Sequence, residues 1–81
     1  MLYHNITVFE LKMMLDQGVN FTIIDVRTPE EYKSGYIPGA INIPVDELLT
    51  RLDELRNKRI LVYCKSGIRS QTAARILVVN G

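Results

Sequence analysis

The sequence predicts an α/β fold in which an open parallel β-sheet carries helices on both faces. The chain has 81 residues, which is enough for one domain at most. Short apolar runs alternate along it with amphipathic stretches, in the order strand–helix–strand–helix–strand–helix. Strands that alternate with helices pair in parallel, and the helices then cover the sheet.

The first predicted elements are a helix and a buried strand. Thr7 and Glu10 form a capping-box pattern, which predicts a helix that begins there and ends at Gly18. Residues 21–26 (FTIIDV) are β-branched and apolar, as is typical of a buried strand. Residues 3–6 are expected to add a short strand before the helix.

A second capping box predicts the next helix. Thr28 and Glu31 stand three residues apart, and Pro29 occupies the first helical position. The helix is expected to be short because Gly35 follows soon after. Residues 40–43 (AINI) then read as a short strand, closed by a proline.

The second half of the chain repeats this alternation. Apolar residues recur at helical spacing over residues 45–55, with charged residues between them. Residues 59–63 (RILVY) predict another buried strand, a loop of small residues follows at 64–70, and residues 71–79 have a helical pattern.

Composition excludes several classes of protein. Hydrophobic residues make up 47% of the chain and charged residues 23%, which is typical of globular domains and argues against disorder. The net charge of +1 argues against a nucleic-acid partner. The longest apolar run, residues 60–64, is too short for a membrane span, and residues 1–5 do not resemble the start of a signal peptide. We therefore expect a cytoplasmic protein with neither a nucleic-acid nor a membrane partner.

The cysteine and the charge distribution draw attention to the second half. With one cysteine the chain forms no internal disulfide and no cysteine-based zinc site, and His4 is the only histidine. Cys64 is thus either a small buried apolar residue or a reactive thiol. Residues 1–50 carry a net charge of −4 and residues 51–81 one of +5, which indicates an anionic ligand near Cys64.

The loop that contains Cys64 favours the reactive thiol. It joins a predicted strand to a helix, and a helix N-terminus stabilises anions and lowers the pKa of a thiol. Gly67 permits a tight turn there. Lys65 and Arg69 add positive charge, and Ser70 is suited to be the N-cap and to donate a hydrogen bond to the sulfur.

Over nearly its whole length the chain resembles a rhodanese-like (sulfurtransferase) domain. Four segments in this order carry the resemblance: 24–27 (IDVR), 29–32 (PEEY), 35–44 (GYIPGAINIP) and 62–70 (VYCKSGIRS). Tyr36 departs from the family pattern, which commonly has histidine at that position.

The resemblance implies a sulfurtransferase in which Cys64 is the nucleophile. The thiolate takes a sulfane sulfur from a small anionic donor such as thiosulfate, or from a persulfide, and passes it to cyanide or a thiol. Asp25 and Arg27 would support the site, although Asp25 could equally cap its own loop. Neither a metal nor an organic cofactor is expected. The substrate-binding residues implied are those that follow the cysteine: Lys65, Ser66, Gly67, Ile68, Arg69 and Ser70.

Two other functions fit parts of the pattern. Cysteine phosphatases use a similar loop with five residues between cysteine and arginine, whereas residues 65–68 leave four here, a tighter ring better suited to one sulfur atom. Some rhodanese-like domains are non-catalytic binding or regulatory modules, but those lack the cysteine. Elsewhere at the site, Arg27 and Glu31 could pair across the helix start, and both are expected to have structural rather than catalytic roles.

The end of the chain predicts an incomplete sheet. Rhodanese-like domains usually continue with a central strand and a closing helix, whereas this chain stops at Asn80–Gly81. We therefore expect residues 1–81 to be a rhodanese-like domain shortened at its C-terminus, either truncated or a fragment. Self-association to a homo-oligomer through the open sheet is then expected.

Overall fold

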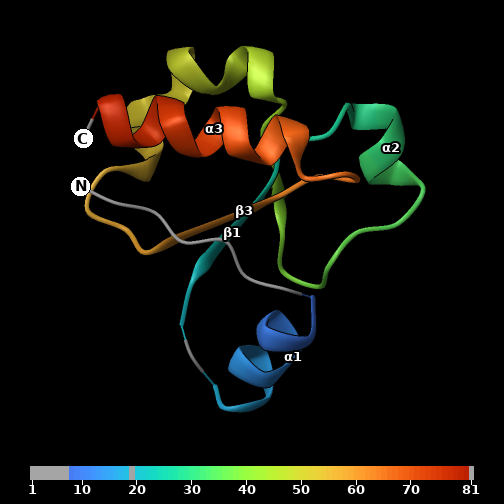
Figure 1. Ribbon diagram of the computed structural model, residues 1–81. Coiled ribbons are helices and arrows are strands. Elements are labelled where there is room, and N and C mark those ends of the chain that lie inside the picture. The colour runs from blue at the N-terminus through green and yellow to red at the C-terminus, as the bar shows by residue number, and fades with distance from the viewer. Residues whose placement is uncertain (1–7, 19, 81) are drawn as a thin grey trace.

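Three parallel strands form the centre of the computed structural model, which describes residues 8–18 and 20–80 (Figure 1). The strands are β1 (Thr22–Asp25), β2 (Ile41–Asn42) and β3 (Ile60–Tyr63). Their order is β2-β1-β3, so β1 lies between the other two. Asp25 stands opposite Asn42 on one side and opposite Tyr63 on the other. The carboxyl ends of the three strands therefore meet at one edge of the sheet.

Helices lie on both faces of the sheet, as the sequence predicts. The helical elements are α1 (Val8–Asp16), α2 (Pro29–Lys33), the 3₁₀ helix η1 (Val45–Leu55) and α3 (Ile68–Val79). Figure 1 shows η1 and α3 together on one side of the strands and α1 on the other. The predicted open α/β fold is thus confirmed.

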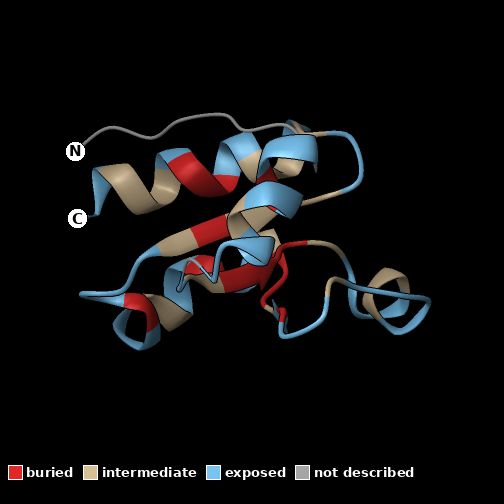
Figure 2. Cartoon of the chain, turned by 90° about the horizontal axis from the view of Figure 1, so that it is seen from below, coloured by how far each residue is buried: buried red, intermediate tan, exposed pale blue. Residues whose placement is uncertain are grey.

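Alternation along the strands divides the core into two clusters. Ile24 and Val26 face η1 and α3, where they pack with Ala73 and other buried residues. Ile23 and Leu61 face the opposite side and pack with Leu11 of α1. Successive side chains of a strand point to opposite faces, so one short strand serves both clusters. Figure 2 shows buried residues running along the strands and on part of α3.

The segment 45–55 differs from the regular helix that its spacing predicts. It is a 3₁₀ helix, interrupted at Arg51, whose φ of −124° and ψ of 20° are not helical. Val45 and Leu48 are three residues apart, as are Leu52 and Leu55, and this matches the 3₁₀ period. The break at Arg51 takes up the four-residue step between the two pairs, so that Leu48 and Leu55 are both buried.

The predicted boundaries agree with the observed ones to within two residues, except at the start of α3. This helix begins at Ile68 rather than at residue 71, so residues 68–70 form its first turn instead of a loop. The predicted strand at residues 3–6 and the cap at Thr7 lie outside the described residues. Within residues 8–18 and 20–80, β3 pairs with β1 alone, and the further strand and the self-association stay predictions.

Candidate functional site

Cys64 directly follows β3 and precedes the first turn of α3. The side chain is half-buried and packs against the core cluster under α3. In open α/β sheets, ligands bind beyond the carboxyl ends of the strands, where the N-terminus of a helix also offers unpaired backbone N–H groups. The half-buried Cys64 side chain therefore lies at the edge of the sheet where the carboxyl ends of the strands meet.

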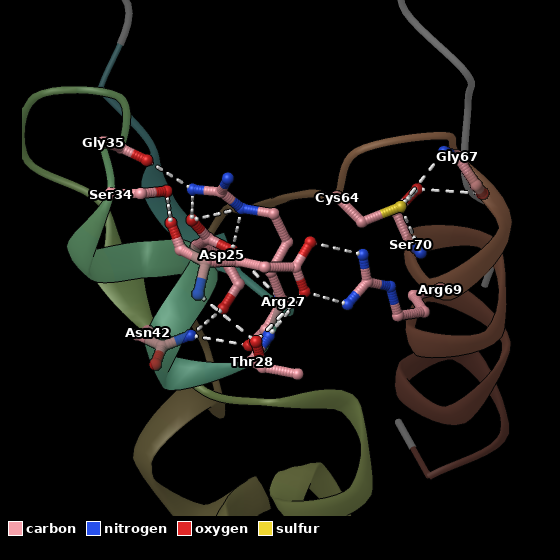
Figure 3. Close-up of polar contacts among 11 residues, drawn as sticks. Asp25, Arg27, Thr28, Ser34, Gly35, Asn42, Cys64, Gly67, Arg69 and Ser70 are labelled. Atoms are coloured by element: carbon pink, nitrogen blue, oxygen red, sulfur yellow. Dashed lines mark hydrogen bonds and ion pairs between the residues drawn. The ribbon is translucent and has the colours of Figure 1, made fainter.

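We call residues 64–70 the sulfur cradle, because two of their backbone N–H groups, those of Gly67 and Ser70, point at the sulfur of Cys64 (Figure 3). The Gly67 N–H donates to Sγ over 3.0 Å and the Ser70 N–H over 3.4 Å. The Cys64 thiol donates to the Ser70 Oγ over 3.6 Å, and this hydroxyl in turn donates to the Gly67 carbonyl at 3.0 Å. Gly67 has a φ of +90°, a left-handed conformation that glycine adopts without strain. The cradle therefore depends on glycine at this position.

These hydrogen bonds favour the thiolate form of Cys64. Burial raises the pKa of the thiol, but the hydrogen bond with the Ser70 side chain and those from the backbone of Ser70, Gly67 and Ser66 outweigh burial and lower the pKa below its usual value. The predicted direction is confirmed, and its cause is the hydrogen-bonding backbone and Ser70. Ser70 does not cap the helix as predicted; Gly67 is the N-cap, because α3 begins one turn earlier.

Arg69 points from α3 toward α2, where Glu31 binds its guanidinium. The two Nη atoms donate to the two carboxylate oxygens at 2.6 and 3.0 Å, across 38 residues of sequence. The hydrogen bonds to Arg69 and Thr28 hold the pKa of Glu31 down, at about 2. The predicted Arg27–Glu31 pair is therefore wrong: Glu31 pairs with Arg69, because α2 and the start of α3 lie side by side at this edge (Figure 3).

Glu31 also closes the predicted capping box of α2. The Thr28 Oγ1 accepts from the Glu31 N–H at 3.3 Å, and the Glu31 Oε1 accepts from the Thr28 N–H at 3.2 Å. One carboxylate thus fixes the N-terminus of α2 and holds the first turn of α3. This links a predicted local motif to the loop that contains Cys64.

Asp25 and Arg27 form a second polar centre beside the sulfur cradle. Asp25 is fully buried, and its carboxylate accepts from the Arg27 N–H at 2.9 Å and from the guanidinium at 2.6–3.0 Å. Burial raises the pKa of Asp25, but the hydrogen bonds from Arg27 more than offset burial and lower it. Asp25 therefore caps its loop, which is one of the two roles that the sequence left open, and it also pairs with Arg27. Its support of the sulfur cradle stays a prediction.

Two further residues at this edge were not foreseen. The Asn42 Nδ2 donates to the backbone carbonyls of Asp25 and Arg27 at 3.0 and 2.9 Å. The Tyr63 ring lies under the Arg27 guanidinium at 5.6 Å, and its hydroxyl accepts from the Ile37 N–H at 3.1 Å. Both stand opposite Asp25 in the strand register, which is the signal that could have identified them.

The remaining predicted site residues lie at the surface. Lys65, Ser66 and Ile68 are exposed around the mouth of the sulfur cradle. Their predicted contact with a substrate stays a prediction. Tyr36, the departure from the family pattern, stacks on Tyr32 with ring centroids 4.1 Å apart.

Known proteins are similar to this chain in sequence. The chain is 41% identical over 71 residues to the putative sulfur carrier protein YrkF of Bacillus subtilis, covering 86% of this chain and 38% of YrkF. It is 42% identical over 61 residues to the thiosulfate sulfurtransferase PspE of Escherichia coli, covering 72% of this chain and 59% of PspE. This chain thus spans less than two thirds of the length of either relative.

A solved structure agrees. The human single-domain sulfurtransferase TSTD1 superposes with a TM-score of 0.80 at 30% identity, covering 94% of this chain and 80% of TSTD1. Within residues 8–18 and 20–80 there is no helix with the length and apolarity needed to cross a membrane. Residues 7–81 match the family described as the rhodanese-like domain, and its relatives include proteins named sulfurtransferases. The chain belongs to the rhodanese-like domain family.

Proposed function

We propose that this chain transfers a sulfane sulfur through a persulfide on Cys64. The observation that carries the proposal is the sulfur cradle, in which two backbone N–H groups converge on a half-buried Sγ at the N-terminus of α3. Such an arrangement stabilises negative charge on sulfur without a counter-ion in contact. The names of the sulfurtransferase relatives support the same reaction class.

In the first half-reaction the Cys64 thiolate attacks the outer sulfur of the donor. With thiosulfate, a new S–S bond forms to Sγ, the S–S bond of thiosulfate breaks, and sulfite leaves with the electron pair. The negative charge passes from Sγ to the terminal sulfur of the persulfide. The lowered pKa of Cys64 supplies the thiolate that this step requires.

In the second half-reaction an acceptor takes the terminal sulfur. Cyanide attacks it, the persulfide S–S bond breaks, and thiocyanate leaves while the electron pair returns to Sγ as the thiolate. A thiol acceptor reacts in the same way and becomes a persulfide. Because the donor product leaves before the acceptor enters, we expect ping-pong kinetics. Neither step requires a metal or an organic cofactor, since electron pairs move only between the substrates and Cys64.

Intact mass measurement tests the proposal. After incubation with thiosulfate and removal of excess donor, we expect the protein to gain the mass of one sulfur atom, and cyanide should then remove that mass and release thiocyanate. The Cys64→Ser variant keeps the size of the side chain and should gain nothing. A folded wild-type protein that acquires no sulfur from thiosulfate or a low-molecular-weight persulfide would overturn the proposal.

A further inference from the structure

The Glu31–Arg69 ion pair is bidentate, although capping α2 does not require Glu31 to bind an arginine. Both side chains are 31% exposed, and both Nη atoms of Arg69 are taken by the carboxylate. A bidentate pair of this kind fixes the plane of the guanidinium as well as its distance. Arg69 is thereby held toward α2.

Arg69 is nevertheless electrostatically coupled to Cys64. Glu31 is the main cause that raises the pKa of Arg69, and the negative charge of Cys64 raises it further. Arg69 directly precedes Ser70, whose N–H donates to Sγ, so an anion at the sulfur is attracted by the Arg69 guanidinium, and the Glu31 carboxylate bound to that guanidinium offsets the attraction. The other cation of the sulfur cradle, Lys65, is exposed to solvent, where its charge is screened.

We propose that Glu31 is a positioning residue that sets the charge selectivity of the sulfur cradle. By compensating Arg69, it lowers the preference of the site for donors with two negative charges relative to donors with one or none. The inference rests on the proposed function for its physiological meaning, because it names the class of donor that Cys64 uses best. That class is sulfur donors with one negative charge or none.

Two matched pairs of reagents measure charge selectivity at Cys64. Thiosulfate carries two negative charges and methanethiosulfonate one, and each gives its outer sulfur to the thiolate while sulfite or methanesulfinate leaves with the electron pair. Iodoacetate carries one negative charge and iodoacetamide none, and both alkylate the thiolate with loss of iodide. Cys64 is the only cysteine, so each rate reports on this residue. The ratio of rates within a pair cancels any change in the thiolate fraction.

Three variants separate the effect of the ion pair from others. Glu31→Gln removes the charge but keeps an oxygen that accepts from Thr28, as glutamine also forms the capping box. Glu30→Gln removes a neighbouring exposed carboxylate on the same helix and leaves Arg69 bound to Glu31. Glu31→Gln with Arg69→Gln removes both partners.

We expect Glu31→Gln to raise both ratios, thiosulfate over methanethiosulfonate in kcat/KM and iodoacetate over iodoacetamide in rate, by about twofold to fivefold. Glu30→Gln should leave both near wild type, and the double variant should return them toward wild type. Ratios in Glu31→Gln equal to those in Glu30→Gln would overturn the inference. If wild type takes sulfur from neither donor, the proposed function fails, and the alkylation ratio alone still decides whether Glu31 sets charge selectivity.

Discussion

Two polar centres share the carboxyl edge of this sheet, and they stabilise charge in opposite ways. The Asp25 centre is closed: the fully buried Asp25 carboxylate accepts hydrogen bonds from the Arg27 guanidinium, whose side chain is 15% exposed, and the two charges neutralise each other. The sulfur cradle is open: the half-buried Sγ accepts from backbone N–H groups, while the nearby cation Arg69 is bound to Glu31. A closed pair supports the structure, whereas an open anion site with N–H donors leaves the sulfur available for chemistry.

Removing the charge of Asp25 from the closed centre is expected to have the largest effect on stability. Asp25→Asn leaves the Arg27 guanidinium beside a neutral group in a buried setting, and we expect it to lower the free energy of unfolding by about 3–5 kcal/mol. Urea denaturation followed by circular dichroism measures this loss. Asp53→Asn breaks the exposed Arg56–Asp53 pair and is the matched control, with little change expected. Equal stability losses in the two variants would show that burial of Asp25 does not matter.

Much of this arrangement could be predicted from local sequence. The apolar runs identify the three described strands, and the Thr28–Glu31 capping box and Pro29 identify α2, because these patterns act over a few residues. Cys64 at a strand end before a helix follows from the same reading. The lowered pKa of its thiol follows as well.

What could not be predicted depends on residues distant in sequence. Asn42 reaches the backbone of Asp25 only because β2 pairs with β1 in one register. On sequence grounds only Arg27 is within reach of Glu31, and it is the placement of α2 against α3 that brings Arg69 to the carboxylate instead. Serine is a favourable N-cap residue, so the sequence places the start of α3 after Ser70. In the structure Gly67, with its positive φ, is the N-cap, and the helix begins at Ile68.

The Glu31–Arg69 ion pair should affect the stability of the protein in acid. The pKa of Glu31 is about 2 in the folded protein, below its ordinary value of 4.5. A lowered folded pKa contributes stability that is present above the ordinary value and is lost as the pH falls toward the folded one. From about pH 5 to about pH 3, wild type and Glu30→Gln should therefore lose more unfolding free energy than Glu31→Gln. The same pH dependence in all three would contradict the assigned pairing.

A smaller effect sharpens the description of the open centre. Ser70→Ala removes the hydroxyl 3.6 Å from Sγ, so we expect the pKa of Cys64 to rise and persulfide formation at neutral pH to slow by about twofold to tenfold, the range for one hydrogen bond. Thr72→Ala is the control, because this hydroxyl on the same helix bonds the Ile68 carbonyl instead. Mass spectrometry over time gives both rates, and indistinguishable rates would remove Ser70 from the cradle.

The most direct measurement is the pH dependence of iodoacetamide alkylation of Cys64 in the wild-type protein. The sulfur cradle stabilises the thiolate, so the midpoint of the curve should lie below about 8.5, the value of a free thiol. Lys65→Gln should leave the midpoint nearly unchanged, because hydrogen bonds and not that cation lower the pKa. A midpoint at or above about 8.5 in the folded protein would contradict the claim that the cradle activates Cys64.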